Sequence, residues 1–205
     1  MRIIFARHGE SEANRKQIIS NRNLPHGLTE VGVSQAYALA QKLADWEVVQ
    51  VFASPILRAK ETGSIIAETF GLPLKIESAL REFDCGMLEG RGDDEAWAAL
   101  SALIRAWDEE HDYARQIMPD GESFDNIRAR FVPFMANLIS VNADLAGDIL
   151  LISHGAVLHQ MLPLLFENVD RAFTQEFPLP NCALVVGETH NSRLVCVEWA
   201  GVKTT

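Results

Sequence analysis

The chain is poor in cysteine. It has three thiols in 205 residues, and none of them belongs to a CxxC pair. This pattern excludes a disulfide framework and a zinc-ligand set, so we expect reduced, partly buried thiols. No run approaches the ~18 apolar residues that a membrane span needs. The first residues lack a signal-peptide pattern as well, because Met1 and Arg2 lead into a short apolar run and then a charge. We therefore expect a nearly complete, cytoplasmic chain with no membrane partner.

Positive charge is also scarce. Eighteen Lys and Arg residues stand against 28 Asp and Glu residues, and the formal net charge is −10. Nucleic-acid-binding proteins present a basic face, so nucleic acid is not expected as a partner. An anionic ligand needs a local positive pocket here, because the overall field repels it. The remaining composition is that of an ordinary globular protein, and the length favours a single domain over residues 1–205.

Short apolar runs alternate with amphipathic stretches along most of the chain. Buried strands are predicted at residues 2–6, 48–53 and 148–153, and a shorter strand at 74–77. Helices are predicted at 29–45, 54–70, 93–111, 123–141 and 155–166. The helix at 54–70 is expected to begin with Ser54 as its cap and Pro55 in its first position. This alternation favours an α/β fold in which a mostly parallel central sheet is covered on both faces, a three-layer α/β/α sandwich.

The C-terminal part follows another pattern. Residues 182–188 and 193–199 have the features of two strands, and the turn chemistry at 190–192 between them predicts an antiparallel hairpin. The hairpin offers a sheet edge, which leaves a homodimer open.

Charged side chains follow the predicted parallel strands, near the point where each strand ends. In chain order they are Arg7, His8, Arg58, Glu82 and His154. In sheets of this class ligands bind beyond the carboxyl ends of the strands. We therefore expect two arginines, two imidazoles and one carboxylate to meet at one edge of the sheet.

This set of side chains suits phosphoryl transfer. Arginine offers a planar fork that binds phosphate through two hydrogen bonds, and positioning and charge supply most of the catalysis. The imidazole of His8 can attack phosphorus, while His154 donates to a phosphoryl oxygen. Glu82 can protonate the departing alkoxide and then deprotonate water. Because the arginines supply positive charge, neither a metal nor another cofactor is required.

Four segments carry a family resemblance: RHGES at 7–11, SPILRAKET at 54–62, LREFDCGMLEG at 80–90 and SHG at 153–155. In this order they resemble the motifs of the histidine phosphatase superfamily, the group of cofactor-dependent phosphoglycerate mutases and acid phosphatases. The resemblance extends from residue 2 to about residue 160 and implies a phosphoglycerate mutase-like fold. It implies that His8 is the phosphorylated nucleophile and Glu82 the acid and base. Arg7, Arg58 and His154 then complete the phosphate pocket.

Further substrate contacts are expected around this pocket. Asn14 matches the Asn of the longer family motif, which implies a contact with phosphate. Ser20 and Asn21 stand where the mutases carry a hydroxyl residue and a Gly that touch substrate. The residues themselves add Gly9, where the backbone can approach closely. They also add Gly155 and Ala156, whose backbone N–H groups at a helix N-terminus form a natural anion site.

The superfamily contains both mutases and phosphatases, which share the phosphohistidine. The mutases carry a considerably longer segment after the Glu loop, with Lys and paired Arg residues that bind the substrate carboxylate. Here the segment from Gly90 to the PDGES stretch at 119–123 is short and acidic, and Cys85 stands where the mutases have Tyr. We therefore expect a metal-independent phosphomonoesterase that acts on a small phosphorylated metabolite. A 2,3-bisphosphoglycerate-dependent phosphoglycerate mutase is the alternative.

Other functions fit the sequence less well. A phospho-ligand sensor without turnover is disfavoured because the nucleophile and the acid are both present. A serine hydrolase is disfavoured because the segment 153–155 is not part of a GxSxG motif. Four histidines have no catalytic setting and are expected on the surface or in packing: His26, His111, His159 and His190. Arg115 is expected to be a solvated charge. The segments at 21–30 and 84–120 depart from the family pattern, so the substrate stays open.

Overall fold

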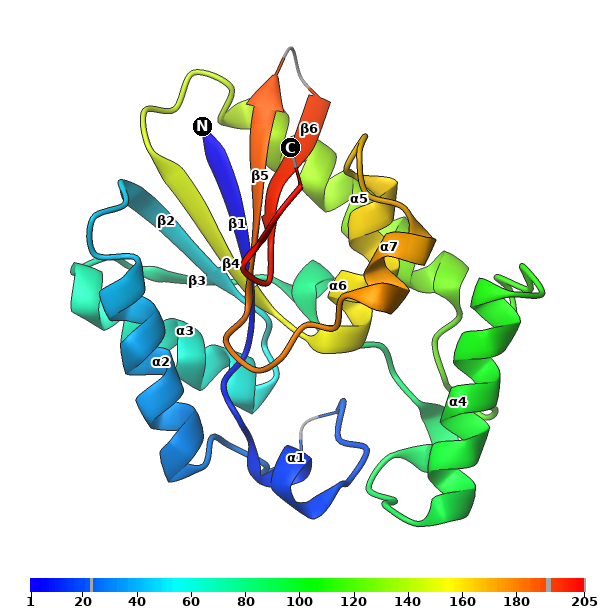
Figure 1. Cartoon of the computed structure of the whole chain (residues 1–205). Helices are drawn as coiled ribbons and strands as arrows, with labels where there is room; N and C mark the ends of the chain where they lie inside the picture. The colour runs from blue at the N-terminus through cyan, green and yellow to red at the C-terminus, as the bar shows by residue number, and fades with distance from the viewer. Residues whose placement is uncertain (23, 191–192, 205) are drawn as a thin grey trace.

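One sheet runs through the centre of the molecule, with strand order β3-β2-β4-β1-β5-β6-β7 (Figure 1). The computed structural model describes the whole chain except residues 23, 191–192 and 205. The strands are β1 (Arg2–Arg7), β2 (Val48–Ala53), β3 (Leu74–Ile76), β4 (Asp148–Ser153), β5 (Leu184–His190), β6 (Arg193–Trp199) and β7 (Val202–Lys203). The pairs among β1, β2, β3 and β4 are parallel, and the pairs from β5 to β7 are antiparallel. The predicted parallel sheet and C-terminal hairpin are confirmed, while residues 191–192 of the predicted turn lie outside the described part.

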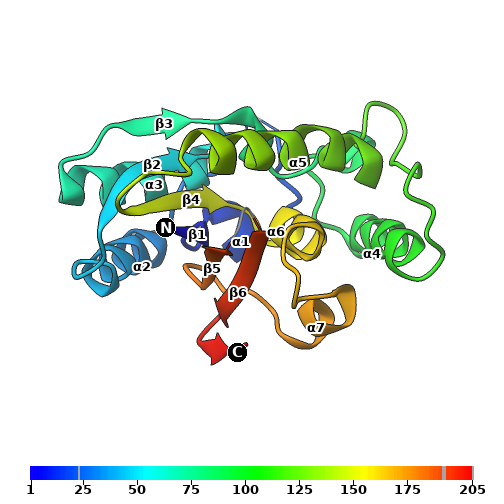
Figure 2. The same cartoon turned by 90° about the horizontal axis from the view of Figure 1, so that it is seen from above.

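Helices cover both faces of this sheet. They are α1 (Glu12–Lys16), α2 (Glu30–Lys42), α3 (Leu57–Phe70), α4 (Asp94–Asp108), α5 (Phe124–Val141), α6 (Gly155–Met161) and α7 (Arg171–Glu176). Seen from above, α2 and α3 lie on one side of the sheet and α5, α6 and α7 on the other (Figure 2). The expected α/β/α sandwich is therefore confirmed. Helix α4 stands farther out, beside α5 and α6.

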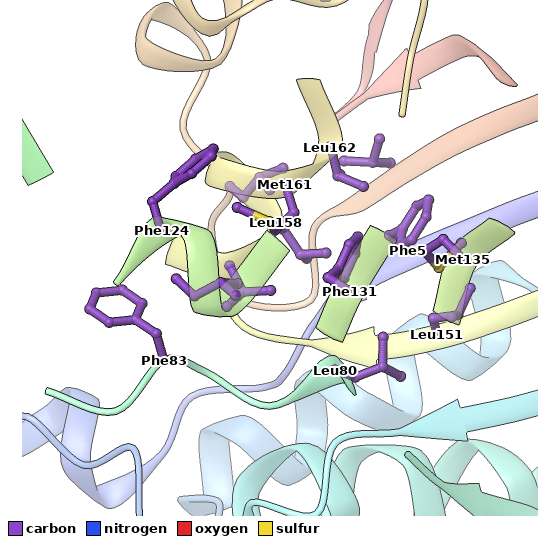
Figure 3. Packing of buried hydrophobic residues seen from close by; sticks show 14 of the residues in the cluster. Phe5, Leu80, Phe83, Phe124, Phe131, Met135, Leu151, Leu158, Met161 and Leu162 are labelled. Carbon is purple, nitrogen blue, oxygen red and sulfur yellow. The ribbon is translucent and has the colours of Figure 1, made fainter. Parts of the chain in front are cut away.

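Alternating residues of the strands supply two separate cores. Ile4 of β1 packs with apolar residues of α2 and α3, and Phe5 packs with those of α5 and α6. The side chains of a strand point to opposite faces in turn, so a strand that is apolar at every position is buried on both sides. Figure 3 shows the second core, where Phe131 and Met135 of α5 meet Phe5 and Leu151.

Two predicted helix boundaries differ from the structure. Helix α3 begins at Leu57, and its cap is Ile56 without a side-chain hydrogen bond. The Ser54 hydroxyl does not cap the helix; it accepts from the N–H of Ile56 at 3.2 Å and lies 2.8 Å from His154 Nε2. The helix predicted at 155–166 ends at Met161 and continues as a 3-10 turn. Pro163 lacks the N–H that would bind the carbonyl of His159, and Arg171 Nη1 donates to that oxygen instead, at 2.8 Å. Helices α1 and α7 and strand β7 were absent from the sequence prediction.

The loop after β1 is packed directly against the first turn of α2. The N–H of Thr29 donates to the carbonyl of Glu10 at 3.0 Å. A Cβ at Gly9 would lie 2.6 Å from the carbonyl oxygen of Gly32, and a Cβ at Gly32 would lie 1.9 Å from that of Glu10. The close approach that Gly9 permits is therefore to α2. This contact fixes the backbone that carries His8.

The substitution Gly32→Ala is expected to destabilise the fold by about 3 kcal/mol, because the added methyl group meets backbone that no rotamer change can move. Urea denaturation measures the loss. Ser34→Ala, a change at an exposed position of the same helix, is the control and should alter stability by less than about 0.5 kcal/mol. A Gly32→Ala protein as stable as the control would show that the loop and α2 are not tightly packed.

Candidate active site

His8 lies just beyond β1 and is 2% exposed. Its Nδ1 is 2.7 Å from the carbonyl oxygen of Gly9, and Arg58 Nε lies 2.8 Å from its Nε2. An arginine nitrogen only donates, so Nε2 is the acceptor and carries a lone pair. The proton therefore resides on Nδ1 and is donated to Gly9. The backbone thus fixes the tautomer that leaves Nε2 available as a nucleophile.

The charge state of His8 supports the same assignment. Burial lowers the pKa of His8 well below its ordinary value of 6.5, and the neighbouring cations Arg58 and Arg7 lower it further. A cationic imidazole would have no lone pair for attack on phosphorus. The surroundings therefore keep His8 neutral, and nucleophilic, at neutral pH.

Arg58 enters the site from the first turn of α3 and is 5% exposed. Besides His8, it donates from Nη1 to the carbonyl of Ser20 and from Nη2 to Asn21 Oδ1, the latter at 3.2 Å. Burial lowers the pKa of Arg58 to about 10, so it stays charged at neutral pH. The loop at residues 20–21 thus holds this guanidinium beside His8.

His154 and Arg7 complete the set of possible donors around His8. His154 is fully buried, and the centroid of its ring lies 5.0 Å from that of His8. Its Nε2 is 2.8 Å from Ser54 Oγ. Two buried nitrogens, His154 Nδ1 and Arg7 Nε, have no hydrogen-bond partner in the described part of the chain. Buried polar groups are normally paired, so these nitrogens mark a place for an acceptor such as a phosphoryl oxygen.

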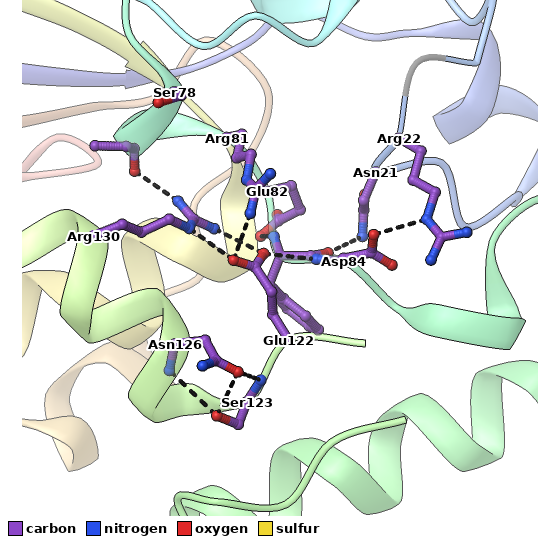
Figure 4. Close-up of polar contacts among 12 residues, drawn as sticks. Asn21, Arg22, Ser78, Arg81, Glu82, Asp84, Glu122, Ser123, Asn126 and Arg130 are labelled. Atoms are coloured by element: carbon purple, nitrogen blue, oxygen red, sulfur yellow. Dashed lines mark hydrogen bonds and ion pairs between the residues drawn. The ribbon is translucent and has the colours of Figure 1, made fainter. Parts of the chain in front are cut away.

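Glu82 lies on the same cavity but is not paired with Arg81. Figure 4 shows that Arg81 and Arg130 both reach Glu122; Arg81 Nη2 donates to it at 2.7 Å. Glu82 binds the N-terminus of α6 instead. Ala156 N donates to its Oε2 at 3.0 Å, and Val157 N donates to its Oε1 at 2.9 Å. Neighbouring Arg81 and Glu82 therefore form no ion pair in the described part of the chain, although the sequence places them side by side.

Burial raises the pKa of Glu82, although Arg58 and three backbone N–H groups oppose the shift. Oε1 accepts from both Phe83 N and Val157 N, whereas Oε2 accepts, among the described residues, from Ala156 N alone. Oε2 is thus the oxygen with capacity for a proton. A carboxyl group with a raised pKa at the wall of the cavity is suited to proton transfer.

The N-terminus of α6 differs from its expected role as a direct substrate site. The Ala156 amide is occupied by Glu82, because a buried carboxylate binds the same free N–H groups that attract a phosphate. Gly155 lies against Arg7, and a Cβ there would come 3.3 Å from Arg7 Nε. Gly155 thus makes room for the guanidinium.

Three residues expected to touch substrate all line the cavity, and their side chains also hold the loops around it. Asn14 Oδ1 accepts from the N–H of Ser11, at 3.1 Å, in the capping box of α1. The hydroxyl of Ser20 lies 2.8 Å from His26 Nδ1. Asn21 Nδ2 donates to the carbonyl of Phe83 at 3.0 Å, which connects the Arg58 loop to the Glu82 loop.

The cavity has a volume of about 520 Å³ and extends well beyond the phosphate pocket. Its outer wall comes from α4, α6 and α7, and it includes His159, which was expected on the surface or in packing. The lining residues of this wall are Trp97, Leu100, Ile104, Asp108, His159, Gln160, Arg171, Thr174 and Gln175, and none of them was predicted to line the site. The apolar spacing of α4 was visible in the sequence, but the period does not show whether a face meets a core or a cavity. Arg115, paired with Glu110, lies outside the lining, as expected for a solvated charge.

Among the described residues, no group of three or more His, Cys, Asp or Glu side chains is placed to hold a metal ion. Across the same part of the chain, the helices are too short or too polar to cross a bilayer.

Comparison with known proteins places this geometry in a family. The model of the histidine phosphatase superfamily (branch 1) matches residues 3–201. The chain belongs to the histidine phosphatase superfamily. A probable phosphoglycerate mutase of Yersinia pestis is 28% identical over 188 residues, which is 90% of this chain and 83% of that protein. The resemblance inferred from the four sequence motifs is thereby confirmed.

Solved structures share the fold of this superfamily member over nearly its whole length. The α-ribazole phosphatase of Shigella flexneri is 25% identical, with a TM-score of 0.80, and the match covers 98% of this chain and 96% of that one. A mycobacterial glucosyl-3-phosphoglycerate phosphatase is 22% identical, with a TM-score of 0.81, and the match covers 98% and 99%. The phosphoglycerate mutase-like architecture is therefore shared with phosphatases as well as with a probable mutase.

Proposed function

We propose that this protein is a metal-independent phosphomonoesterase that hydrolyses a small phosphorylated metabolite through a phosphohistidine on His8. The observation that carries the proposal is the hydrogen bonding of His8, in which Gly9 fixes the proton on Nδ1 and the unprotonated Nε2 accepts from Arg58, the residue expected to bind the phosphoryl group. The buried Arg58 and the partly buried Arg7, beside a neutral imidazole, suit the attack of nitrogen on a phosphoryl group.

The reaction proceeds in two steps. The phosphoryl oxygens accept hydrogen bonds from Arg7, Arg58 and His154, and His8 Nε2 forms a bond to phosphorus while the ester P–O bond breaks. Glu82 gives its proton to the departing oxygen and becomes a carboxylate. That carboxylate then takes a proton from water, whose oxygen attacks phosphorus and releases phosphate from His8.

The cations of the cavity favour hydrolysis over mutase activity. A phosphoglycerate acceptor carries a carboxylate, which calls for a cation outside the phosphate pocket. Among the described residues of the lining, Arg171 is the arginine farther along the cavity, and it is already paired with Asp108. An acceptor carboxylate would therefore find no unpaired guanidinium there, whereas water needs none. The similar proteins include named phosphatases, which supports a phosphatase here. They also include a probable phosphoglycerate mutase, so mutase activity remains the alternative.

Phosphate release from a panel of phosphomonoesters tests the proposal. The assay contains a chelator and is run with and without 2,3-bisphosphoglycerate. Strong release that is indifferent to the bisphosphate and sensitive to vanadate, a mimic of five-coordinate phosphorus, is the expected result. Interconversion of monophosphoglycerates that depends on the bisphosphate, with little release, would instead identify a mutase. Loss of activity in chelator would contradict a metal-independent mechanism.

The pH dependence follows from the two perturbed groups. His8 acts when deprotonated, so activity should rise with pH through its lowered pKa, below the ordinary value of 6.5. Glu82 acts as an acid when protonated, so kcat/KM for alkyl esters should fall as pH rises through its raised pKa, above the ordinary value of 4.5. The rate profile of an alkyl ester should therefore be bell-shaped, with an acid limb below pH 6.5 and an alkaline limb above pH 4.5. An acid limb centred at or above pH 6.5 would contradict the neutral state of His8.

A further inference from the structure

Helix α4 presents two different apolar faces. Leu103, Ala106 and Trp107 are buried in the core, whereas Trp97, Leu100 and Ile104 line the cavity. The cavity-lining positions recur at helical spacing on one side of α4. From Trp97 to Asp108 this stripe spans roughly 16 Å along the helix axis, at a rise of 1.5 Å per residue. A wall of this length exceeds what a three-carbon ester can contact.

Trp97 is held in place at one end of this wall. Its Nε1–H donates to the carbonyl of Gln17 at 2.9 Å, so the donor is satisfied, and 37% of the residue stays exposed. An indole that is fixed and partly uncovered offers a flat apolar surface at little loss of conformational entropy on binding. This end of the wall suits a ring or another flat group.

The other end of the wall is polar but electrically balanced. Asp108 forms an ion pair with Arg171 and lies 3.4 Å from Gln160 Nε2 and 3.3 Å from Gln175 Nε2. Arg171 is held in turn by the carbonyl of His159, which is free because of Pro163. The positive charge of Arg171 is thus already balanced by the carboxylate of Asp108. A negatively charged group of a substrate would therefore be only weakly attracted to this end of the wall.

Gln160 gives an independent sign of a ligand at this end. The residue is 3% exposed and lines the cavity, yet its Oε1 has no hydrogen-bond partner in the described part of the chain. A buried acceptor without a donor is unfavourable. A hydroxyl or amide N–H of a bound molecule would supply that donor.

We propose that the wall formed by α4, α6 and α7 is a subsite for the alcohol part of the substrate. That part is a large uncharged group, with a flat or apolar face for Trp97 and hydroxyl or amide groups for the Asp108–Arg171 end. This inference rests on the proposed phosphomonoesterase function and narrows its substrate class. The expected substrates are large neutral esters, such as sugar or nucleoside phosphates, rather than short esters that carry a carboxylate.

A series of primary phosphomonoesters tests the subsite, because the leaving groups then differ in size and charge but little in reactivity. The matched small pair is glycerol 3-phosphate and 3-phosphoglycerate. They have the same three-carbon skeleton, and 3-phosphoglycerate carries a carboxylate where glycerol 3-phosphate carries a CH2OH group. The larger members are glucose 6-phosphate and a nucleoside 5′-phosphate. We expect kcat/KM for the best large neutral ester to exceed that for 3-phosphoglycerate by about tenfold or more. The proposal would be overturned if the two small esters were hydrolysed as well as, or better than, the large neutral esters.

Variants of the wall give a second comparison. Trp97→Ala should lower the ratio of kcat/KM for the large ester to that for glycerol 3-phosphate by about tenfold, and Trp97→Phe should restore most of it. Asp108→Asn frees the charge of Arg171 and should raise the ratio for 3-phosphoglycerate over glycerol 3-phosphate by about tenfold. The matched control is Glu109→Gln, which removes the same charge at an exposed neighbouring position and should leave both ratios unchanged. Ratios unaltered by Trp97→Ala and Asp108→Asn would contradict the subsite.

Binding separates this inference from the proposed function. Phosphonate analogues of the same esters, in which CH2 replaces the ester oxygen, report the preference for the alcohol part without turnover. Absence of hydrolysis for every ester would overturn the phosphomonoesterase, while calorimetry on the phosphonates would still decide the subsite. A preference for the carboxylate-bearing phosphonate would overturn the neutral subsite even in an active phosphatase.

Discussion

Replacing His8 with alanine is expected to lower kcat by about 10⁴-fold or more, because the phosphohistidine cannot form without its nucleophile. The fold should survive. The ring makes one backbone hydrogen bond, to Gly9, and its loop is held separately by the N–H of His8 on Ser153 and by Thr29 on Glu10. Circular dichroism and the midpoint of urea unfolding verify this. Phosphate release from a generic aryl ester measures the loss.

Trapping of the intermediate makes the test specific to nitrogen. Wild-type protein quenched during turnover should carry acid-labile, alkali-stable phosphate, as expected for a phosphoramidate, and His8→Ala protein should carry none. His111→Asn is the matched control, because His111 lies outside the cavity lining and has a positive φ that Asn tolerates. It should retain full activity. Turnover that persists in His8→Ala protein would remove His8 from the mechanism.

Glu82→Gln is expected to slow hydrolysis of alkyl esters by about 10³-fold, the range of general acid catalysis. Aryl esters, whose leaving groups need little protonation, should lose less than about tenfold in the step that breaks the ester bond. Single-turnover kinetics separates this step from hydrolysis of the phosphohistidine, in which Glu82 acts as the base. Gln is similar in shape and has no transferable proton. Its amide oxygen can accept from Phe83 N and Val157 N as Oε1 does, whereas its NH2 group cannot replace Oε2 as an acceptor for Ala156 N.

The pH profile distinguishes proton transfer from a structural role of Glu82. In wild-type protein the fall of kcat/KM with rising pH should be present for alkyl esters, and in Glu82→Gln protein it should be much reduced. The substrate's own second ionisation is the same for both proteins, so the difference between the two profiles reports Glu82. Equal losses on alkyl and aryl esters with an unaltered profile would assign Glu82 only to holding α6.

Much of the fold and the core of the site could be predicted from the sequence. The apolar runs that became β1 and β4 are local signals, since a strand buried on both faces needs an unbroken apolar stretch. The run that became β2 was also recognisable, but this strand includes Gln50 and, contrary to the expectation, is only partly buried. Once these strands are parallel, the residues that follow them must meet at one edge of the sheet. Arg7, His8, Arg58 and His154 could therefore be grouped before any contact was known.

Boundaries and short elements were less predictable. Ser54 has the composition of a helix cap, but in the structure its hydroxyl lies beside His154 and the helix begins at Leu57. Helix α7 is six residues long and carries Arg171, and so short a helix leaves little periodicity to detect. Tertiary contacts, rather than local preference, determine both.

The sequence by itself determined the sheet, the order of its helices and the set of groups at its edge, because periodicity and strand-end position are properties of neighbouring residues. Only the tertiary structure decided how those groups act. It placed Glu82 on the N-terminus of α6 rather than on Arg81, and it fixed the proton of His8 on Nδ1. It also turned one apolar side of α4 toward a cavity and joined Asp108 to Arg171 across 63 positions of the chain. These choices depend on which surfaces meet in space, and the spacing of residues along the chain carries no record of that.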